Sequence, residues 1–341
     1  MIGNIIANKY IIKEKIGSGK FGTVFKGEHV KHKTEVAIKM ENTAHECNTI
    51  KYETTILNYL YTNGCRVIPS VIWYGIYGDY KCLTMDYYNQ TMDQYISLVR
   101  EKYASSPLEY LKQIIKIIVN MVSIIRHVHK HHIIHRDIKP ENFMLKDTEL
   151  HLIDFGIASA VPPNICDINT EPDRTTVIGS PKYISYYVHS GYEPMYRDDL
   201  ISIGYCVFYF ILGKLPWDEV SSSDNTPPTH LLHEKNQIRK KWKQLNNIEK
   251  IIKNIRQKTT VVAIPENGTS IGVGSLSGER CDERGPEFCR REELSGKYNE
   301  IYKNISDYFA LCYNLQLDEI PLYNELLMVL QVPNIYKCPK V

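Results

Sequence analysis

The sequence predicts an α+β fold with two lobes, in which a small β-rich lobe with one main helix precedes a larger, mostly α-helical lobe. Short alternating or β-branched runs, separated by glycines, fill most of the first 88 residues. From residue 106 onward, apolar residues instead recur with the period of a helix. The chain has 341 residues, of which 43% are hydrophobic, so it can bury a core in each lobe.

The small lobe is expected to span residues 1–88. Gly78 and Asp79 join the last two apolar runs as a hairpin turn, and Ile50, Ile56 and Leu60 mark one face of a single helix. The expected strands are residues 10–16, 23–29, 35–40, 71–77 and 80–85.

The large lobe is expected to span residues 89–341. Ser106 to Glu109 predict a capping box at the start of a long helix, and the apolar run 200–212 predicts a helix buried on all sides. Residues 235–258 combine nine basic residues with apolar residues at helical spacing, which predicts one amphipathic helix with its charges in solvent. Residues 259–296 lack this pattern and are interpreted as an exposed insertion, or alternatively as a partly ordered connection between helices.

The composition indicates which partners and which cellular compartment can be expected for the chain. A formal net charge of +2 produces no strong field, and neither a nucleic acid nor a membrane is expected as a partner. Nine cysteines without a C-x-x-C pair predict free thiols in a reducing compartment. No secretory signal and no apolar run of about 20 residues is visible, so we expect a soluble, intracellular monomer.

A glycine-rich turn lies between the first two predicted strands. Its pattern is G-x-G-x-x-G-x-V, and glycines let a backbone approach phosphate groups closely. A dinucleotide site would open a helix here, whereas a strand follows, so a turn that covers a nucleotide's phosphates is favoured. A purely structural turn is the alternative. The residues concerned are Ile16, Gly17, Ser18, Gly19, Lys20, Phe21, Gly22, Thr23 and Val24.

A lysine follows on the third predicted strand. Lys39 ends the run V-A-I-K about 20 residues after the glycines, where its ammonium can reach phosphate oxygens. Because a buried ammonium needs a partner charge, Glu53 in the small-lobe helix is its expected partner. Glu46 is the rival, although it lies in a polar stretch, and two surface side chains without a shared role are the other alternative.

The strongest pattern is H-R-D-x-K-x-x-N at residues 135–142, followed by D-F-G at 154–156. Asp137 can accept the proton of a hydroxyl group, and Lys139 can neutralise a phosphoryl group in transfer. Asn142 and Asp154 supply oxygen atoms of the kind that magnesium prefers. Together these residues predict phosphoryl transfer from a nucleotide.

With these motifs the chain resembles eukaryotic-type protein kinases, which have the bilobal protein kinase fold. A second set of residues narrows the resemblance to the casein kinase 1 family, including its vaccinia-related and giant-virus members. The set comprises G-S-P-K-Y-I-S at 179–185 in place of a segment ending in A-P-E, R-D-D-L-I-S-I-G-Y at 197–205 and L-P-W at 215–217. The resemblance covers residues 9 to about 220 and resumes at 308–330.

This resemblance implies an ATP- and Mg²⁺-dependent kinase that acts on serine or threonine residues of proteins. The composition, rich in Ile, Lys and Tyr, suits an AT-rich viral or protist genome, and the host cell of a large DNA virus is an expected setting. The resemblance implies that Asp199 braces the catalytic loop. It also implies that Lys182, with Arg174, contacts an anionic group of the substrate, although Thr175 and Ser221 replace basic residues of the family. The implied adenine pocket consists of Ile16, Val24, Ala37, Met85, Asp86, Tyr88, Met144 and Ile153.

Three other interpretations stay open. A pseudokinase would act as a binding scaffold, but such proteins normally lose one of the residues Lys39, Asp137 or Asp154. A small-molecule kinase of the same fold would lack Lys139-Pro140 and the 179–183 segment. Five histidines between residues 127 and 135 could suggest a metal site, but they lack regular ligand spacing.

Overall fold

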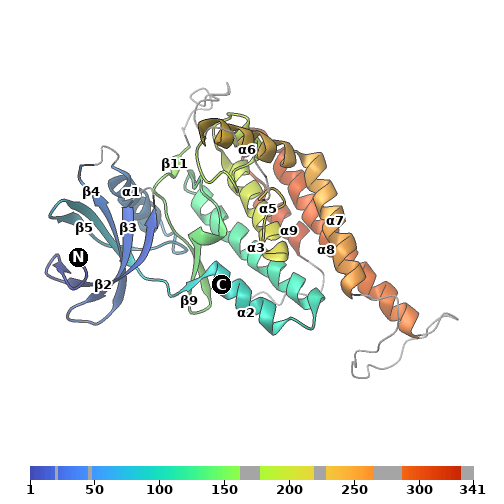
Figure 1. Ribbon diagram of the computed structural model, residues 1–341, viewed down its shortest axis with the longest axis horizontal. Coiled ribbons are helices and arrows are strands. Elements are labelled where there is room, and N and C mark those ends of the chain that lie inside the picture. The colour runs from blue at the N-terminus through green and yellow to red at the C-terminus, as the bar shows by residue number, and fades with distance from the viewer. Residues whose placement is uncertain (20–21, 45–47, 162–176, 219–227, 264–285, 332–341) are drawn as a thin grey trace.

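A computed structural model of the chain describes residues 1–19, 22–44, 48–161, 177–218, 228–263 and 286–331. Figure 1 shows a sheet with one helix at the N-terminal end and a larger group of helices beside it. The bilobal α+β fold expected from the sequence is therefore confirmed.

The small lobe is built on a six-stranded antiparallel sheet with the strand order β1-β2-β3-β4-β6-β5. Tyr10, Ile12, Phe25 and Ile38 form a core on one face of the sheet. The helix α1 (Thr49–Thr62) contacts β4, β5 and β6 and buries Ile50, Ile56, Leu57 and Leu60. The strands are β1 (Ile5–Ile6), β2 (Tyr10–Gly19), β3 (Gly22–His29), β4 (Glu35–Asn42), β5 (Val71–Tyr77) and β6 (Tyr80–Asp86).

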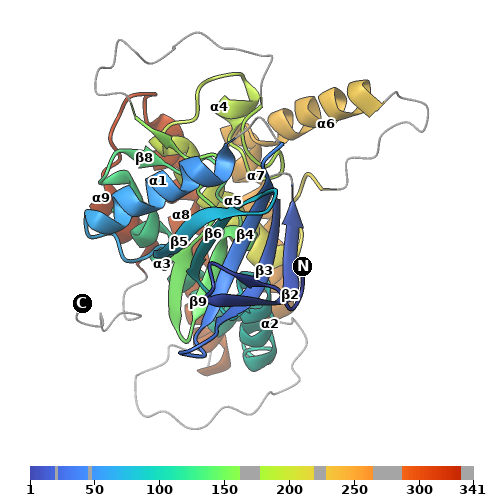
Figure 2. The same cartoon turned by 90° about the vertical axis from the view of Figure 1, so that its left-hand side faces the viewer.

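The large lobe surrounds one buried helix, α5 (Tyr196–Leu212), as the apolar run predicted. It packs against α3 (Pro107–His129) and α8 (Pro286–Asn314), and α8 also contacts α7 (Leu245–Ala263) and α9 (Tyr323–Leu330). Figure 1 shows α7 and α8 side by side as a long pair at the end of the lobe. The remaining helices are α2 (Met92–Lys102), α4 (Tyr186–His189) and α6 (Pro228–Trp242), and Figure 2 shows α6 extending from the body of the lobe.

Short strands at the junction of the lobes carry the residues of interest. A three-stranded sheet has the order β10-β9-β7, and β8 pairs with β11. These pairings bring the segments on either side of residues 135–142 and 153–158 together. The elements are β7 (Gln90–Thr91), β8 (Ile133–Ile134), the 3-10 turn η1 (Pro140–Asn142), β9 (Phe143–Lys146), β10 (Glu149–Leu152) and β11 (Ser159–Ala160).

Two local predictions were wrong. Ser106 precedes α3, but its side chain makes no capping hydrogen bond, and Glu109 pairs with Lys112 instead. The single amphipathic helix expected over 235–258 is two helices, α6 and α7, which are separated at residues 243–244. The sequence predicted a buried Trp242 and lysines in solvent. At the break Trp242 is instead exposed, and Lys243 is buried.

The ends of the stretch 259–296 are helical. The helix α7 continues to Ala263 and α8 begins at Pro286, while residues 264–285 lie outside the described chain. Elsewhere, within the ranges given above, no helix combines the length and the apolar character needed to cross a bilayer.

Candidate active site

Lys39 lies between two carboxylates that come from different lobes. Its Nζ is 2.7 Å from Glu53 Oε2 on α1 and 2.7 Å from Asp154 Oδ1 in the large lobe. Glu53 is completely buried and also accepts a hydrogen bond of 3.1 Å from the backbone N–H of Phe155. Glu53 is thus the glutamate that pairs with Lys39, and Glu46 lies outside the described residues.

Charge and burial oppose each other in this cluster. Burial disfavours the Lys39 ammonium, but the two carboxylates outweigh this effect and raise the pKa of Lys39. Burial alone would raise the pKa of Asp154, but the neighbouring ammonium holds that pKa below its ordinary value. Burial raises the pKa of Glu53, against the effect of Lys39 and the Phe155 N–H. The Lys39 ammonium therefore stays charged within β4, between the two carboxyl groups.

The Asp137 carboxylate is held by three neighbours. Lys139 Nζ lies 2.6 Å from its Oδ2, and Asn142 Nδ2 donates to the backbone oxygen at 2.7 Å and to Oδ2 at 3.2 Å. The backbone N–H of Ser180 donates to Oδ1 at 2.9 Å. The Ile153 N–H donates to the backbone oxygen of Asn142 at 2.9 Å, which links this loop to the residue before Asp154.

Asp199 binds the backbone at the start of the loop that carries Asp137. Its two carboxylate oxygens accept from the backbone N–H groups of His135 and Arg136 at 2.8 and 2.9 Å, and His129 Nε2 lies 2.9 Å away. Arg136 and Asp154 have left-handed φ angles of 67° and 65°, a conformation that costs a non-glycine residue free energy. Arg136 is held in it by Asp199, and Asp154 is held by Lys39.

Ser180 is a site residue that we did not single out from the sequence. Besides its N–H contact with Asp137, its hydroxyl accepts from Lys139 Nζ at 3.1 Å. It belongs to the G-S-P-K-Y-I-S segment, but its distance of 43 residues from Asp137 left nothing in the sequence to show the contact.

The residues of the proposed adenine pocket lie at the lobe junction. Ala37 and Met85 face each other across β4 and β6, and both are buried. Met144 lies on β9, and Ile153 follows β10. Tyr88 is buried with its ring stacked on His151 at 4.6 Å.

Other predicted contacts lie at the edges of this region. Ile16 is 45% exposed, and Gly17 and Val24 pair across β2 and β3. The Asp86 carboxylate accepts hydrogen bonds from Ser70. Ser18, Gly19, Gly22 and Thr23 continue the β2–β3 pairing, whereas Lys20 and Phe21 lie outside the described residues.

Of the predicted substrate-anion contacts, Lys182 is the one that lies within the described residues. Lys182 is exposed and its Nζ lies 3.0 Å from Asp218 Oδ1. Arg174 and Thr175 lie outside the described residues, as does Ser221. The histidines diverge: His129 contacts Asp199, while His135 Nε2 lies 3.0 Å from the Ile153 backbone oxygen.

The remaining donor atoms suit magnesium. The Asn142 amide nitrogen is engaged with Asp137, so its carbonyl oxygen is the atom that a cation would take. One oxygen of Asp154 binds Lys39, and the carboxylate retains a second oxygen on a partly exposed side chain. Magnesium is commonly held by one or two such oxygen ligands together with substrate phosphates.

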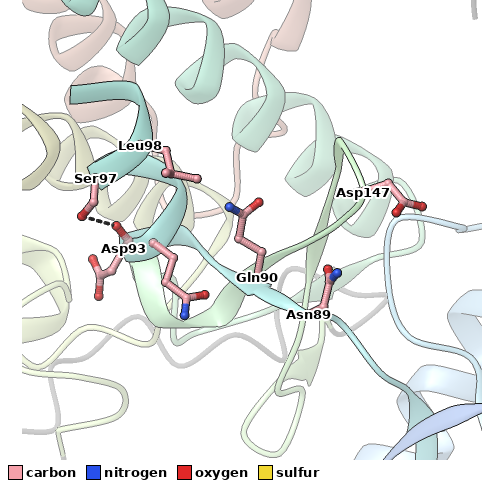
Figure 3. A pocket seen from close by; sticks show the side chains of 7 residues that line it. Asn89, Gln90, Asp93, Ser97, Leu98 and Asp147 are labelled. Atoms are coloured by element: carbon pink, nitrogen blue, oxygen red, sulfur yellow. Dashed lines mark hydrogen bonds between the residues drawn. The ribbon is translucent and has the colours of Figure 1, made fainter. Parts of the chain in front are cut away.

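A separate hollow of about 710 Å³ lies on the large lobe. Figure 3 shows its lining on β7, α2 and the β9–β10 turn, including Gln90, Asp93 and Asp147. Neither Lys39 nor Asp137 lines it, so we assign it no part in the chemistry.

A comparison with known protein families agrees with this arrangement of residues. The family model of the protein kinase domain matches residues 10–266, which is more than half of the chain. The matched range contains the glycine-rich turn, Lys39, the Asp137 loop, Asp154 and Asp199.

Proposed function

This chain belongs to the protein kinase domain family, and we propose that it is an active serine/threonine kinase similar to the casein kinase 1 family. The observation that carries the proposal is the meeting of the two charged clusters. Lys39 with Glu53 and Asp154 lies at the lobe junction, and Asp137 with Lys139 and Asn142 adjoins it through the Ile153–Asn142 hydrogen bond.

Each residue of the clusters then has a role in phosphoryl transfer from ATP. Lys39 binds phosphate oxygens, and Asp137 orients a substrate hydroxyl and accepts its proton. Lys139 neutralises the charge that develops on the transferred group. Asn142 and Asp154 would hold Mg²⁺, which supplies charge neutralisation at the phosphates when bound. Asp199 keeps the loop in shape and does not touch the reacting atoms.

Several residues support the finer assignments. Lys139, two residues after Asp137, is the lysine typical of kinases that modify serine or threonine, and it contacts Ser180. The segment 179–185 and the L-P-W at 215–217 carry the resemblance to the casein kinase 1 family. We further propose that the glycine-rich turn covers the phosphates and that the pocket around Ala37 and Met85 takes the adenine.

The two rival functions are less well supported. A pseudokinase scaffold does not require Lys39, Asp137, Asn142 and Asp154 to retain their mutual contacts, yet all of them do. A small-molecule kinase does not require Ser180 and its segment to close on Asp137 and Lys139.

The test is transfer of labelled phosphate from γ-labelled ATP to casein in the presence of Mg²⁺. We expect Asp137→Asn to lower the rate by about 10²–10⁴-fold, because the proton acceptor and its charge are lost. The matched control Asp318→Asn changes an exposed aspartate on the large lobe and should keep the wild-type rate.

Labelled phosphoamino acids identify the residue type, and phosphotyrosine alone would contradict the serine/threonine assignment. A wild-type protein that binds ATP tightly but transfers nothing would favour the scaffold. Transfer to a sugar or an aminoglycoside but not to casein would favour the small-molecule kinase.

A further inference from the structure

Lys243 is a lysine without exposed surface, in the two-residue break between α6 and α7. Burial of an ammonium is costly unless hydrogen bonds or an opposite charge compensate it. Within the described ranges, no carboxylate forms an ion pair with Lys243. Burial, followed by the charge of Arg239, lowers the pKa of Lys243, and the charge of Asp218 opposes this effect. The site described above also makes no use of it. Its burial therefore needs an explanation from its neighbours.

The ammonium is satisfied by backbone carbonyls of one segment. Lys243 Nζ donates to the backbone oxygens of Pro181 and Ile184 at 3.1 and 2.6 Å, and it lies 3.3 Å from His189 Nε2. An ammonium has three N–H donors, which the two carbonyl oxygens and an unprotonated His189 Nε2 satisfy. The ring centroids of Tyr205 and Trp217 lie 5.0 Å from Nζ on α5 and the loop after it, where their faces stabilise a cation.

The backbone carbonyls of Lys182 and Tyr183, which lie between those of Pro181 and Ile184, also contact side-chain donors. Trp217 Nε1 donates to the Lys182 backbone oxygen at 2.8 Å. Ser202 Oγ lies 2.8 Å from the backbone oxygens of both Tyr183 and Asp198, which share its single proton. Four consecutive carbonyl groups, at residues 181–184, thus each contact a side chain from outside the segment. Lys243 provides the bonds at both ends of this row.

The same segment contacts the catalytic loop through Ser180. Ser180, the residue before the row, donates its N–H to Asp137 and accepts from Lys139. The backbone N–H groups of Tyr183 and Ile184 turn back to the Ser180 backbone oxygen at 2.8 and 3.0 Å. A shift of the row would therefore move Ser180 relative to Asp137.

We propose that Lys243 is a positioning residue, whose buried ammonium fixes the backbone of residues 181–184 so that Ser180 meets Asp137 and Lys139 and the segment can receive a peptide. The role in peptide binding rests on the proposed function. The role in fixing the segment rests on the contacts alone. Lys243 touches neither substrate nor nucleotide and acts only through the segment.

The test compares the full-length wild type with Lys243→Met, which keeps a long side chain but removes all three donors. The control is Lys241→Met, because Lys241 is exposed on α6. Hydrogen exchange at the Tyr183 and Ile184 amides should become about tenfold faster or more in Lys243→Met, because a charge-assisted bond at each end of the row is lost. Exchange of the β4 amides should stay unchanged, and Lys241→Met should behave like wild type.

A kinetic measurement separates positioning from general loss of structure. In Lys243→Met the KM for a peptide substrate should rise about tenfold or more, while the KM for ATP stays within about twofold, because the lost bonds lie on the peptide side only. Unchanged exchange at Tyr183 and Ile184, or equal rises of both KM values, would overturn the proposal.

If Lys243→Met also speeds exchange in β4, its effect is not confined to residues 181–184, and a milder variant then tests the segment. Trp217→Phe keeps an aromatic ring but deletes the single N–H bond to the Lys182 oxygen, and it should speed exchange at Tyr183 and Ile184 about threefold. No change in that variant would contradict the row as a fixed unit. If wild type transfers no phosphate, the proposed function fails while the exchange measurements still decide the role of Lys243.

Discussion

His189 illustrates how burial and a neighbouring charge together change the pKa of a side chain. Its Nε2 lies 3.2 Å from the Pro181 backbone oxygen and 3.3 Å from Lys243 Nζ. Burial, followed by the charge of Lys243, lowers the pKa of His189 to about 2. The ring is consequently neutral in the folded protein at every pH at which a kinase would act.

This depressed pKa predicts acid sensitivity. Below about pH 6.5 the unfolded chain takes up a proton at this residue and the folded chain does not, so the free energy of unfolding falls as the pH falls. Between pH 7.5 and 5.5 the His189 contribution should be a loss of about 1.4 kcal/mol. His189→Gln, which cannot titrate, should lose that much less when urea unfolding is measured at both pH values.

The control for this prediction is His127→Gln, since His127 is exposed on α3. Its loss of stability between the two pH values should equal that of wild type. Equal losses in wild type and His189→Gln would show that His189 is protonated in the folded state as readily as in the unfolded one.

At the residue scale, the sequence could predict side chains whose chemistry follows local spacing. Lys39, Asp137, Asn142 and Asp154 stand in short motifs, and Glu53 could be chosen because an apolar helix face surrounds it. Lys243 could not be predicted, because the carbonyls that satisfy it lie 59 and 62 residues away.

At the scale of elements, the buried helix α5 sets the packing of the large lobe. Gly204 on α5 faces Phe309 on α8, and a Cβ placed on Gly204 would come within 2.6 Å of that ring. Phe309 also stacks on Phe208 with ring centroids 5.3 Å apart and is fully buried. The ring therefore has little freedom to move aside.

Gly204→Ala should lower the free energy of unfolding by about 1–2 kcal/mol, because the clash outweighs the gain in helix propensity. Chemical denaturation measures this change. The matched control is Gly296→Ala on the exposed face of α8, where a Cβ meets nothing within 4 Å. That variant should be more stable by up to about 1 kcal/mol. A stabilised Gly204→Ala protein would mean that α5 and α8 do not pack as closely as described.

Periodicity predicted most elements, but it failed where a helix ends without glycine or proline. The expected strands appear in β2 to β6 with small differences in their bounds, because alternation and turn residues mark them. The break at residues 243–244 carries no such mark. The apolar spacing of Ile238 and Trp242 continued across it in the sequence, although both side chains are exposed in the fold.

For the whole molecule, the two lobes share one charged cluster. Lys39 of the sheet binds Asp154 of the large lobe, and Glu53 of α1 accepts from the Phe155 N–H. A ligand that engages both Lys39 and Asp154 would therefore hold the lobes together. Bilobal architecture was predictable from the change of period near residue 106, but this meeting of the lobes depends on the folded chain.

Nucleotide binding should therefore stabilise the whole chain in a magnesium-dependent manner. A non-hydrolysable ATP analogue with Mg²⁺ at 100 times its dissociation constant should add about 2.7 kcal/mol to the free energy of unfolding, seen as a higher unfolding temperature. Removing Mg²⁺ with a chelator should reduce the shift in wild type. Asp154→Asn should show a small shift that no longer depends on Mg²⁺, because the carboxylate that we assign to the metal is gone, while Asp318→Asn should match wild type. If the oxygens of Asn142 and Asp154 hold the metal, the site owes its affinity for phosphates to the cation between them. A wild-type shift that is the same with and without Mg²⁺ would therefore contradict the assignment of these two residues as metal ligands.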